Sequence, residues 1–137
     1  MLDRINVLII DDCEDDRAMY ERTLRDANTQ QLSVMHAESG EEGLLLLEEH
    51  PMDCVLLDYS LPGKNGINIL RTIRANFPYL AVVMLTGHGN EAIAVEVMKS
   101  GAQDYIIKNN INKESLYRTV SRAIAQCSMV QRIEEQR

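Results

Sequence analysis

The sequence has little cysteine, and what it has forms no recognisable site. Cys13, Cys54 and Cys127 stand far apart without a CxxC pair. This spacing argues against a disulfide framework or a zinc site and favours a reducing compartment. The three histidines show no metal-ligand spacing and are expected at the surface or in loops. A cytoplasmic protein is therefore expected.

Long hydrophobic runs and basic stripes are also missing. No apolar run is long enough to span a membrane, and the start, MLDRINVLIIDD, lacks the length and cleavage site of a secretory signal. With 14 basic and 21 acidic side chains, the net charge of −7 argues against direct nucleic-acid binding. What is present is an ordinary globular composition, 45% hydrophobic and 26% charged, over 137 residues. That length suits one domain with a real core.

Short apolar runs alternate with amphipathic stretches along the chain. The predicted strands cover residues 6–10, 32–37, 54–58, 80–86 and 104–108. The predicted helices cover residues 14–28, 41–49, 67–76 and 91–100, and a last helix starts near Asn112, a good capping residue. This alternation indicates repeated βαβ units, and therefore an α/β fold with a parallel sheet and helices on both faces. Functional sites of such sheets lie at the carboxyl ends of the strands.

Charged and hydroxyl side chains follow the predicted strands at those ends. Asp11 and Asp12 follow the first strand, while Asp58, Thr86 and Lys108 end the third, fourth and fifth. Each aspartate alone is typical of a turn or a helix start, and a lone Thr or Lys at a strand end is more often incidental. Two carboxylates about 4 Å apart repel by roughly 4 kcal/mol at an effective dielectric of about 20, so three acids beside one lysine call for a divalent cation. An all-oxygen ligand set suits Mg²⁺ or Mn²⁺, which could recruit a phosphate.

Three active-site chemistries could use such an acidic edge. A flavodoxin-like cofactor site needs a loop rich in glycine and hydroxyls after the first strand, whereas this chain has DDCEDD there. A haloacid-dehalogenase-type phosphatase needs a second aspartate two residues after its nucleophile, but Cys13 and Ser60 occupy those positions. Phosphoryl transfer onto an aspartate needs a carboxylate nucleophile, a metal held by other acids, and cationic or hydroxyl groups for the arriving oxygens. All of these are present.

Four segments of the sequence resemble the receiver domains of response regulators in two-component signalling, the chemotaxis regulator among them. They are VLIIDDCEDDR, VLLDYSLPGKNG, VVMLTGHGN and AVEVMKSGAQDYIIK, in the family's order and spacing, and the match covers residues 5–124. The resemblance implies a flavodoxin-like, doubly wound sheet of five parallel strands in the order 2-1-3-4-5. It also implies a signalling domain that is phosphorylated. Such a domain is not an enzyme, and it takes part only in its own phosphorylation and slow dephosphorylation.

The resemblance assigns roles to the acids at the strand ends. Asp58 matches the phosphoacceptor of the family. Asp11 and Asp12 match the acidic pair that organises Mg²⁺, with Asp58 and the main-chain carbonyl of Ser60 as further ligands.

The same resemblance places the phosphoryl-contacting and switch residues. Thr86 and Lys108 match the residues that contact the phosphoryl group, and Tyr105 matches the aromatic switch that turns inward when Thr86 moves. Ser60 and His88 occupy positions that tune the lifetime of the phosphoryl group in the family; two polar loop residues without such a role are the alternative.

One departure from the family pattern lies beside the site lysine. The family usually has a proline after this lysine, often with a cis peptide, whereas Asn109 follows Lys108 here. A cis peptide before a non-proline residue costs about 2.5–4 kcal/mol, so a trans peptide is predicted.

The end of the chain continues the pattern of the last helix. Apolar residues recur there at alternating four- and three-residue steps, as in a coiled-coil seam: Leu116, Val120, Ala123, Cys127 and Val130. We expect a receiver domain over residues 1–126 and an extension of its last helix over residues 127–137. The extension either leads into an output domain and supports a homodimer, or is a solvated, frayed end.

The expected partners follow from the resemblance. The phosphoryl donor would be a sensor histidine kinase or a histidine phosphotransfer protein. An output domain or protein would bind the face made by the fourth helix, fifth strand and fifth helix. No direct contact with nucleic acid or membrane is expected. The alternative function is a pseudo-receiver, a binding scaffold without phosphoryl transfer, which missing acid or lysine positions would favour.

Overall fold

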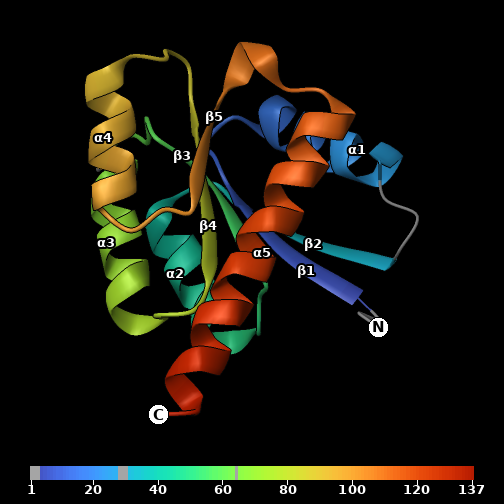
Figure 1. The fold of residues 1–137 in the computed structure, drawn as a ribbon. Helices are drawn as coiled ribbons and strands as arrows, with labels where there is room; N and C mark the ends of the chain where they lie inside the picture. The colour runs from blue at the N-terminus through green and yellow to red at the C-terminus, as the bar shows by residue number, and fades with distance from the viewer. Residues whose placement is uncertain (1–3, 28–30, 64) are drawn as a thin grey trace.

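The computed structural model describes residues 4–27, 31–63 and 65–137, and Figure 1 shows their path. The strands are β1 (Arg4–Ile10), β2 (Gln31–Ala37), β3 (Cys54–Asp58), β4 (Ala81–Thr86) and β5 (Asp104–Ile107). The helices are α1 (Glu14–Ala27), α2 (Gly40–Glu49), α3 (Gly66–Asn76), α4 (Glu91–Lys99) and α5 (Lys113–Glu135), with a short 3-10 helix, η1 (Lys108–Asn110), before α5. The alternation of strands and helices is as predicted.

All five strands are parallel and form one sheet in the order β2-β1-β3-β4-β5, which confirms the predicted flavodoxin-like topology. The register aligns the carboxyl ends of the central strands. Ile10 of β1 pairs with Leu57 of β3, so Asp11 and Asp58 lie at the same level of the sheet. Thr86 pairs with Ile107, which places Lys108 just beyond the end of β4.

Helices cover both faces of the sheet, with α1 and α5 on one side and α2, α3 and α4 on the other (Figure 1). Successive side chains of a strand point to opposite faces, so each central strand contributes to two cores. In β3, Val55 and Leu57 pack on the α2–α4 side, whereas Cys54 and Leu56 pack on the α1–α5 side. This explains the near-continuous apolar runs of β1, β3 and β4.

Asparagine side chains cap the N-termini of α3, α4 and α5. Asn65, Asn90 and Asn112 each accept a main-chain N–H of the first turn of α3, α4 and α5. At Asn112 the bond is reciprocal, because the hydroxyl of Ser115 also accepts from the Asn112 N–H, which confirms the predicted start of the last helix. Gly101 follows α4 with a φ of +112°, the left-handed conformation of a helix C-cap.

The predicted boundaries differ from the observed ones by a few residues. Leu80 precedes β4, because its N–H bonds back to the carbonyl of Phe77 in a turn. Lys108 does not end β5 but begins η1, which the bond from the Ile111 N–H to the Lys108 carbonyl closes. Asn28, the predicted end of the first helix, lies outside the described residues. No cis peptide occurs among the described residues, so the Lys108–Asn109 bond is trans as predicted.

Helix α5 is longer than its contact with the sheet. Its buried residues are Leu116, Val120, Ala123 and Cys127, and every residue after Cys127 is exposed. The helix continues to Glu135 without a break. Within the described ranges, none of the helices combines the length and the apolar character needed to cross a membrane.

Candidate functional site

Three aspartates gather at the carboxyl edge of the sheet. Asp11 and Asp12 directly follow β1, and Asp58 is the last residue of β3. Each can offer one carboxylate oxygen to a common point, because these oxygens all lie within 4.8 Å of one another. Asp11 and Asp58 are buried and Asp12 is exposed. The structure therefore brings together the three acids that the sequence placed at this edge, with one side of the cluster open to solvent.

Lys108 lies among these acids. Its Nζ is 3.2 Å from Asp58 Oδ1 and 3.4 Å from Asp11 Oδ2. A third carboxylate, that of Asp16, lies 3.6 Å away, and the sequence analysis missed it. The available signal was its position, since Asp16 lies in the first turn of α1, directly after the loop that carries Asp11 and Asp12. With Asp16 the acids outnumber the lysine by three, more than was counted from the strand ends.

Burial and mutual repulsion make these carboxylates reluctant to ionise. Burial raises the pKa of Asp58, and the charge of Asp11 raises it further, while Lys108 and the Ser60 amide oppose the shift. Burial likewise raises the pKa of Asp11 against the lowering effect of the Cys13 amide and Lys108. Burial alone would lower the pKa of Lys108. The neighbouring negative charges, that of Asp58 first among them, outweigh burial and raise the pKa. The Lys108 ammonium therefore stays charged, but its single positive charge does not compensate the negative charges of the carboxylates around it.

The loop after β3 shapes the surroundings of Asp58. The Ser60 amide donates to Asp58 Oδ1 at 3.2 Å, and the Tyr59 amide donates to the carbonyl of Leu85. Gly66, at the start of α3, donates to the Tyr59 carbonyl, and a Cβ there would lie 2.3 Å from the Asp58 carbonyl oxygen. Glycine is therefore required for α3 to approach the end of β3 this closely.

Thr86 is at the edge but its hydroxyl does not bond to Asp58. Its Oγ1 donates to the carbonyl of His88 at 2.6 Å and accepts from the His88 amide at 3.1 Å. His88 is exposed in the loop between β4 and α4. Tyr105, on β5, is half-buried and packs against the core on the α2–α4 side. The hydroxyl of Thr86 therefore makes its hydrogen bonds within the loop that follows β4.

Behind the acid pair lies a buried cation that the sequence analysis also missed. Arg17 of α1 is 8% exposed, and its Nη1 donates to the main-chain carbonyl of Asp11 at 2.6 Å. Its Nε donates to Nδ1 of His36, a half-buried residue of β2. His36 lies in the edge strand β2 with its side chain 32% exposed, so the expectation of a surface or loop position holds for it only in part. The one sequence signal was an arginine in the first turn of a helix, where the helix dipole disfavours a cation.

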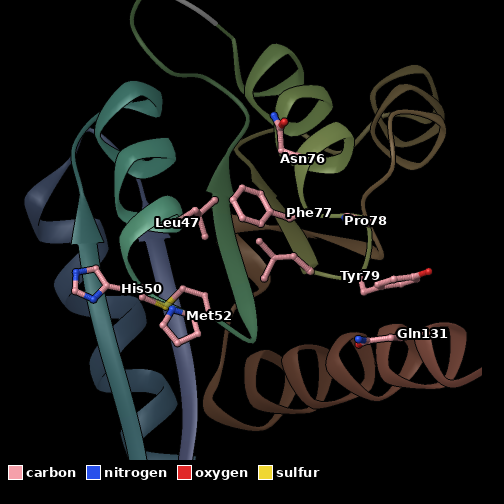
Figure 2. Close-up of a pocket in the computed structure, with 10 residues that line it drawn as sticks. Leu47, His50, Met52, Asn76, Phe77, Pro78, Tyr79 and Gln131 are labelled. Atoms are coloured by element: carbon pink, nitrogen blue, oxygen red, sulfur yellow. The ribbon is translucent and has the colours of Figure 1, made fainter. Parts of the chain in front are cut away.

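A separate cavity of about 340 Å³ lies at the opposite edge of the sheet, near the amino-terminal ends of β3 and β4. Figure 2 shows Leu47 of α2 and Phe77 facing one another there, with Gln131 of α5 nearby. None of the residues that line it is an acid or a lysine. The cluster of Asp11, Asp12 and Asp58 lies at the other edge.

Comparisons with known proteins point to one family. The sequence model of the response regulator receiver domain matches residues 7–121. A putative NtrX-like response regulator from Rickettsia bellii is 36% identical over 121 residues, which cover 87% of this chain and 24% of that protein. The chemotaxis protein CheY of Listeria monocytogenes is 32% identical over 104 residues, 76% of this chain and 86% of that protein. The chain spans about a quarter of the length of the NtrX-like relatives.

Solved structures agree with the sequence matches. NtrX from Brucella abortus superposes with a TM-score of 0.84 at 28% identity, over 96% of this chain and 29% of that one. A putative response regulator from Chloroflexus aurantiacus gives a TM-score of 0.81 at 29% identity, over 89% of this chain and 98% of that one. Together with the sheet order and the acidic cluster beside a lysine, these matches show that the chain belongs to the response regulator receiver domain family of two-component systems.

Proposed function

We propose that this chain accepts a phosphoryl group on Asp58 and that a phosphohistidine of a partner protein supplies it. The observation that carries the proposal is the position of the Asp58 carboxylate, 3.2 Å from the Lys108 ammonium and in one cluster with Asp11 and Asp12. A buried carboxylate with a cation on one side and acids on the other suits a nucleophile for phosphoryl transfer.

The acidic cluster fits Mg²⁺, or Mn²⁺ in its place. Asp11, Asp12 and Asp58 supply oxygen atoms only, which are the ligands that these ions prefer, and we assign the main-chain carbonyl of Ser60 as a further ligand. The raised pKa values of Asp11 and Asp58 also favour an added cation, because both carboxylates lack compensating charge. When bound, the ion would neutralise charge on the phosphoryl oxygens during transfer.

In the proposed transfer, a carboxylate oxygen of Asp58 attacks the phosphorus of the phosphohistidine. The new P–O bond forms as the P–N bond breaks, and the bonding electron pair remains on the imidazole nitrogen of the donor. Lys108 then donates from Nζ to a phosphoryl oxygen, and the hydroxyl of Thr86 leaves His88 to donate to another. This exchange frees the loop before α4 and lets Tyr105 turn inward. Ser60 and His88 remain candidates for setting the lifetime of the product.

The partners follow from the same proposal. A sensor histidine kinase or a histidine phosphotransfer protein would be the donor, in a cytoplasmic setting. An output domain or protein would read the face of α4, β5 and α5, and direct binding to nucleic acid or membrane is not part of the proposed role. Relatives named NtrX-like and ZraR extend well beyond the matched part, which is 24–28% of their length, and this supports an output domain next to the receiver. We assign the receiver to residues 1–126 and the linking extension to residues 127–137.

The direct test is labelling with acetyl phosphate and Mg²⁺, followed by mass spectrometry. The wild-type chain should gain one phosphoryl group on Asp58, and Asp58→Asn should gain none, because the amide is not a nucleophile. Asp53→Asn is a matched control, since Asp53 lies at the other end of β3 and accepts from the main-chain amide of Asn6. It should be labelled like the wild type.

Two results would contradict the proposal. Undiminished labelling of Asp58→Asn would place the phosphoryl group on another residue. A folded wild-type chain that no donor labels would favour the pseudo-receiver, a scaffold without phosphoryl transfer.

A further inference from the structure

Arg17 is a buried cation whose hydrogen bonds go to the acid-pair loop and to the neighbouring strand. A buried guanidinium must have its donors satisfied, and here Nη1 donates to the Asp11 carbonyl at 2.6 Å and Nε to His36 Nδ1 at 3.3 Å. Among the described residues, no carboxylate lies within 4 Å of Arg17. Arg17 therefore does not serve to neutralise a carboxylate. Its shorter hydrogen bond goes to the peptide that joins Asp11 to Asp12, so it orients that peptide.

The orientation of His36 follows from the donors around it. Arg17 Nε–H can only donate, so Nδ1 of His36 accepts and the ring hydrogen is on Nε2. Nε2 lies 2.6 Å from Oε1 of Glu21, and the other oxygen of Glu21 accepts from Arg25 at 2.8 Å. Burial alone would raise the pKa of Glu21, but the bonds from His36 and Arg25 outweigh it and lower the pKa. Glu21 therefore stays ionised and fixes the ring that fixes Arg17.

Asp11 is thus held by main-chain groups or by Arg17 at every polar group except Oδ2, which accepts from Lys108 Nζ. Its amide donates to the carbonyl of Ala37 in β2, its carbonyl accepts from Arg17, and its Oδ1 accepts from the Cys13 amide at 2.9 Å. Only Oδ2 is left to face Lys108. The bond from Arg17 sets the plane of the peptide after Asp11, and that plane sets the direction in which Asp12 leaves the strand.

From this geometry we infer that Arg17 is a positioning residue for the metal site and that His36, held by Glu21, orients it. The inference rests on the proposed function, because it concerns the ion that Asp11 and Asp12 would hold. Residues that orient metal ligands through such contacts change metal affinity by roughly 10- to 100-fold when they are lost. Neither Arg17 nor His36 touches the ion or the phosphoryl group in this role.

The test measures the affinity of the full chain for Mg²⁺ by following amide NMR signals, without any phosphoryl donor. We expect Arg17→Met to weaken Mg²⁺ binding by about tenfold or more. Arg74→Met is the matched control. Arg74 is also a partly buried arginine that donates to main-chain carbonyls, those of Gly101, Phe77 and Pro78, but far from the acids. It should lower thermal stability and leave the affinity for Mg²⁺ unchanged.

The histidine provides a second, gentler pair of variants that leaves Arg17 in place. His36→Gln keeps an acceptor for Arg17 and a donor for Glu21, whereas His36→Leu removes both. We expect the leucine variant to bind Mg²⁺ several-fold more weakly and the glutamine variant to bind it like the wild type.

The outcomes separate this inference from the proposed function. A wild-type chain that binds no Mg²⁺ would contradict the metal site itself. Wild-type affinity in a folded Arg17→Met variant would overturn the positioning role alone. If Arg17→Met does not fold, the histidine pair decides: a leucine variant that binds Mg²⁺ as tightly as the glutamine variant overturns the inference, and weaker binding supports it.

Discussion

At the scale of single residues, the acidic cluster buries like charges at a cost to stability. Asp11 and Asp58 are 0% and 3% exposed, yet both are acids, and Lys108 compensates only part of their charge. Burial raises the pKa of both carboxyls above their ordinary value of 3.8, and for Asp58 the neighbouring Asp11 adds to the shift. Without a metal ion, these two carboxyls therefore bind protons more readily in the folded chain than in the unfolded chain.

This predicts a pH-dependent gain in stability when Asp58 loses its charge. The unfavourable contribution of an acid with a raised pKa is present above its folded pKa and disappears as the pH falls through that value toward 3.8. Without metal, Asp58→Asn should exceed the wild type in free energy of unfolding at neutral pH, because the neutral amide carries no buried charge that Asp11 would repel. The difference should shrink at acidic pH.

Urea unfolding in the presence of a chelator, at several pH values, measures this difference. Added Mg²⁺ should stabilise the wild type more than the variant, because the variant lacks one ligand. A difference that stays constant with pH, or grows toward acidic pH, would show that ionised Asp58 is not the source of the effect.

At the scale of elements, two contacts connect the site to α4. The hydroxyl of Thr86 bonds to the main chain of His88, in the loop that leads into α4. The hydroxyl of Tyr59, next to Asp58, donates to Glu96 of α4 at 2.9 Å. Helix α4 itself is lightly anchored, because Val97 is its one buried residue. A structural change at the end of β3 or β4 can therefore shift α4 through these two contacts.

The Thr86 contact predicts a separation of phosphorylation from its structural response. Thr86→Ala keeps Asp58, Lys108 and the acids, so labelling by acetyl phosphate should continue. Without the hydroxyl, the changes that phosphorylation causes in the amide signals of α4 and in the ring signals of Tyr105 should become smaller. Amide and aromatic NMR spectra with and without the phosphoryl group measure both.

Thr72→Ala is the control for removing a threonine hydroxyl, because Thr72 bonds only within α3 in the described structure. Its response to phosphorylation should match that of the wild type. Spectral changes of full size in Thr86→Ala would mean that the threonine does not couple the site to α4.

At the scale of the whole molecule, α5 has two different halves. Up to Cys127 it packs on the sheet, and beyond it Met129, Val130 and Ile133 are 64%, 46% and 54% exposed. The exposed residues lie at one-, three- and four-residue spacings, so they form one apolar stripe on the extended end of the helix. A second copy of the chain, packed helix to helix, is the partner that we predict for this stripe.

Self-association through this stripe should depend on its apolar side chains. Because burial of an isoleucine side chain contributes about 1.5–3 kcal/mol, Ile133→Glu should weaken the dimer by about tenfold or more. Leu45→Glu is the control, since Leu45 is an equally exposed apolar residue, 60% exposed, on α2. Analytical ultracentrifugation over a range of concentrations, with and without phosphorylation, measures the dimer. A monomer under all of these conditions would rule out this interface.

Much of the molecule could be predicted from the sequence by itself, for a local reason. The strands of a covered parallel sheet must be apolar on both faces, so β1, β3 and β4 stand out as runs. Their carboxyl ends must then meet at one edge, so the sequence predicts that Asp11, Asp12 and Asp58 lie together, as the structure shows.

Only the tertiary structure decided which partners these side chains take. Lys108 also faces Asp16, the hydroxyl of Thr86 bonds to His88, and Arg17 holds the Asp11 carbonyl. These contacts depend on how α1 docks beside β2 and on where β5 ends. Local sequence patterns set the kind and order of the elements, but hydrogen-bond partners depend on the packing of elements that are distant in sequence.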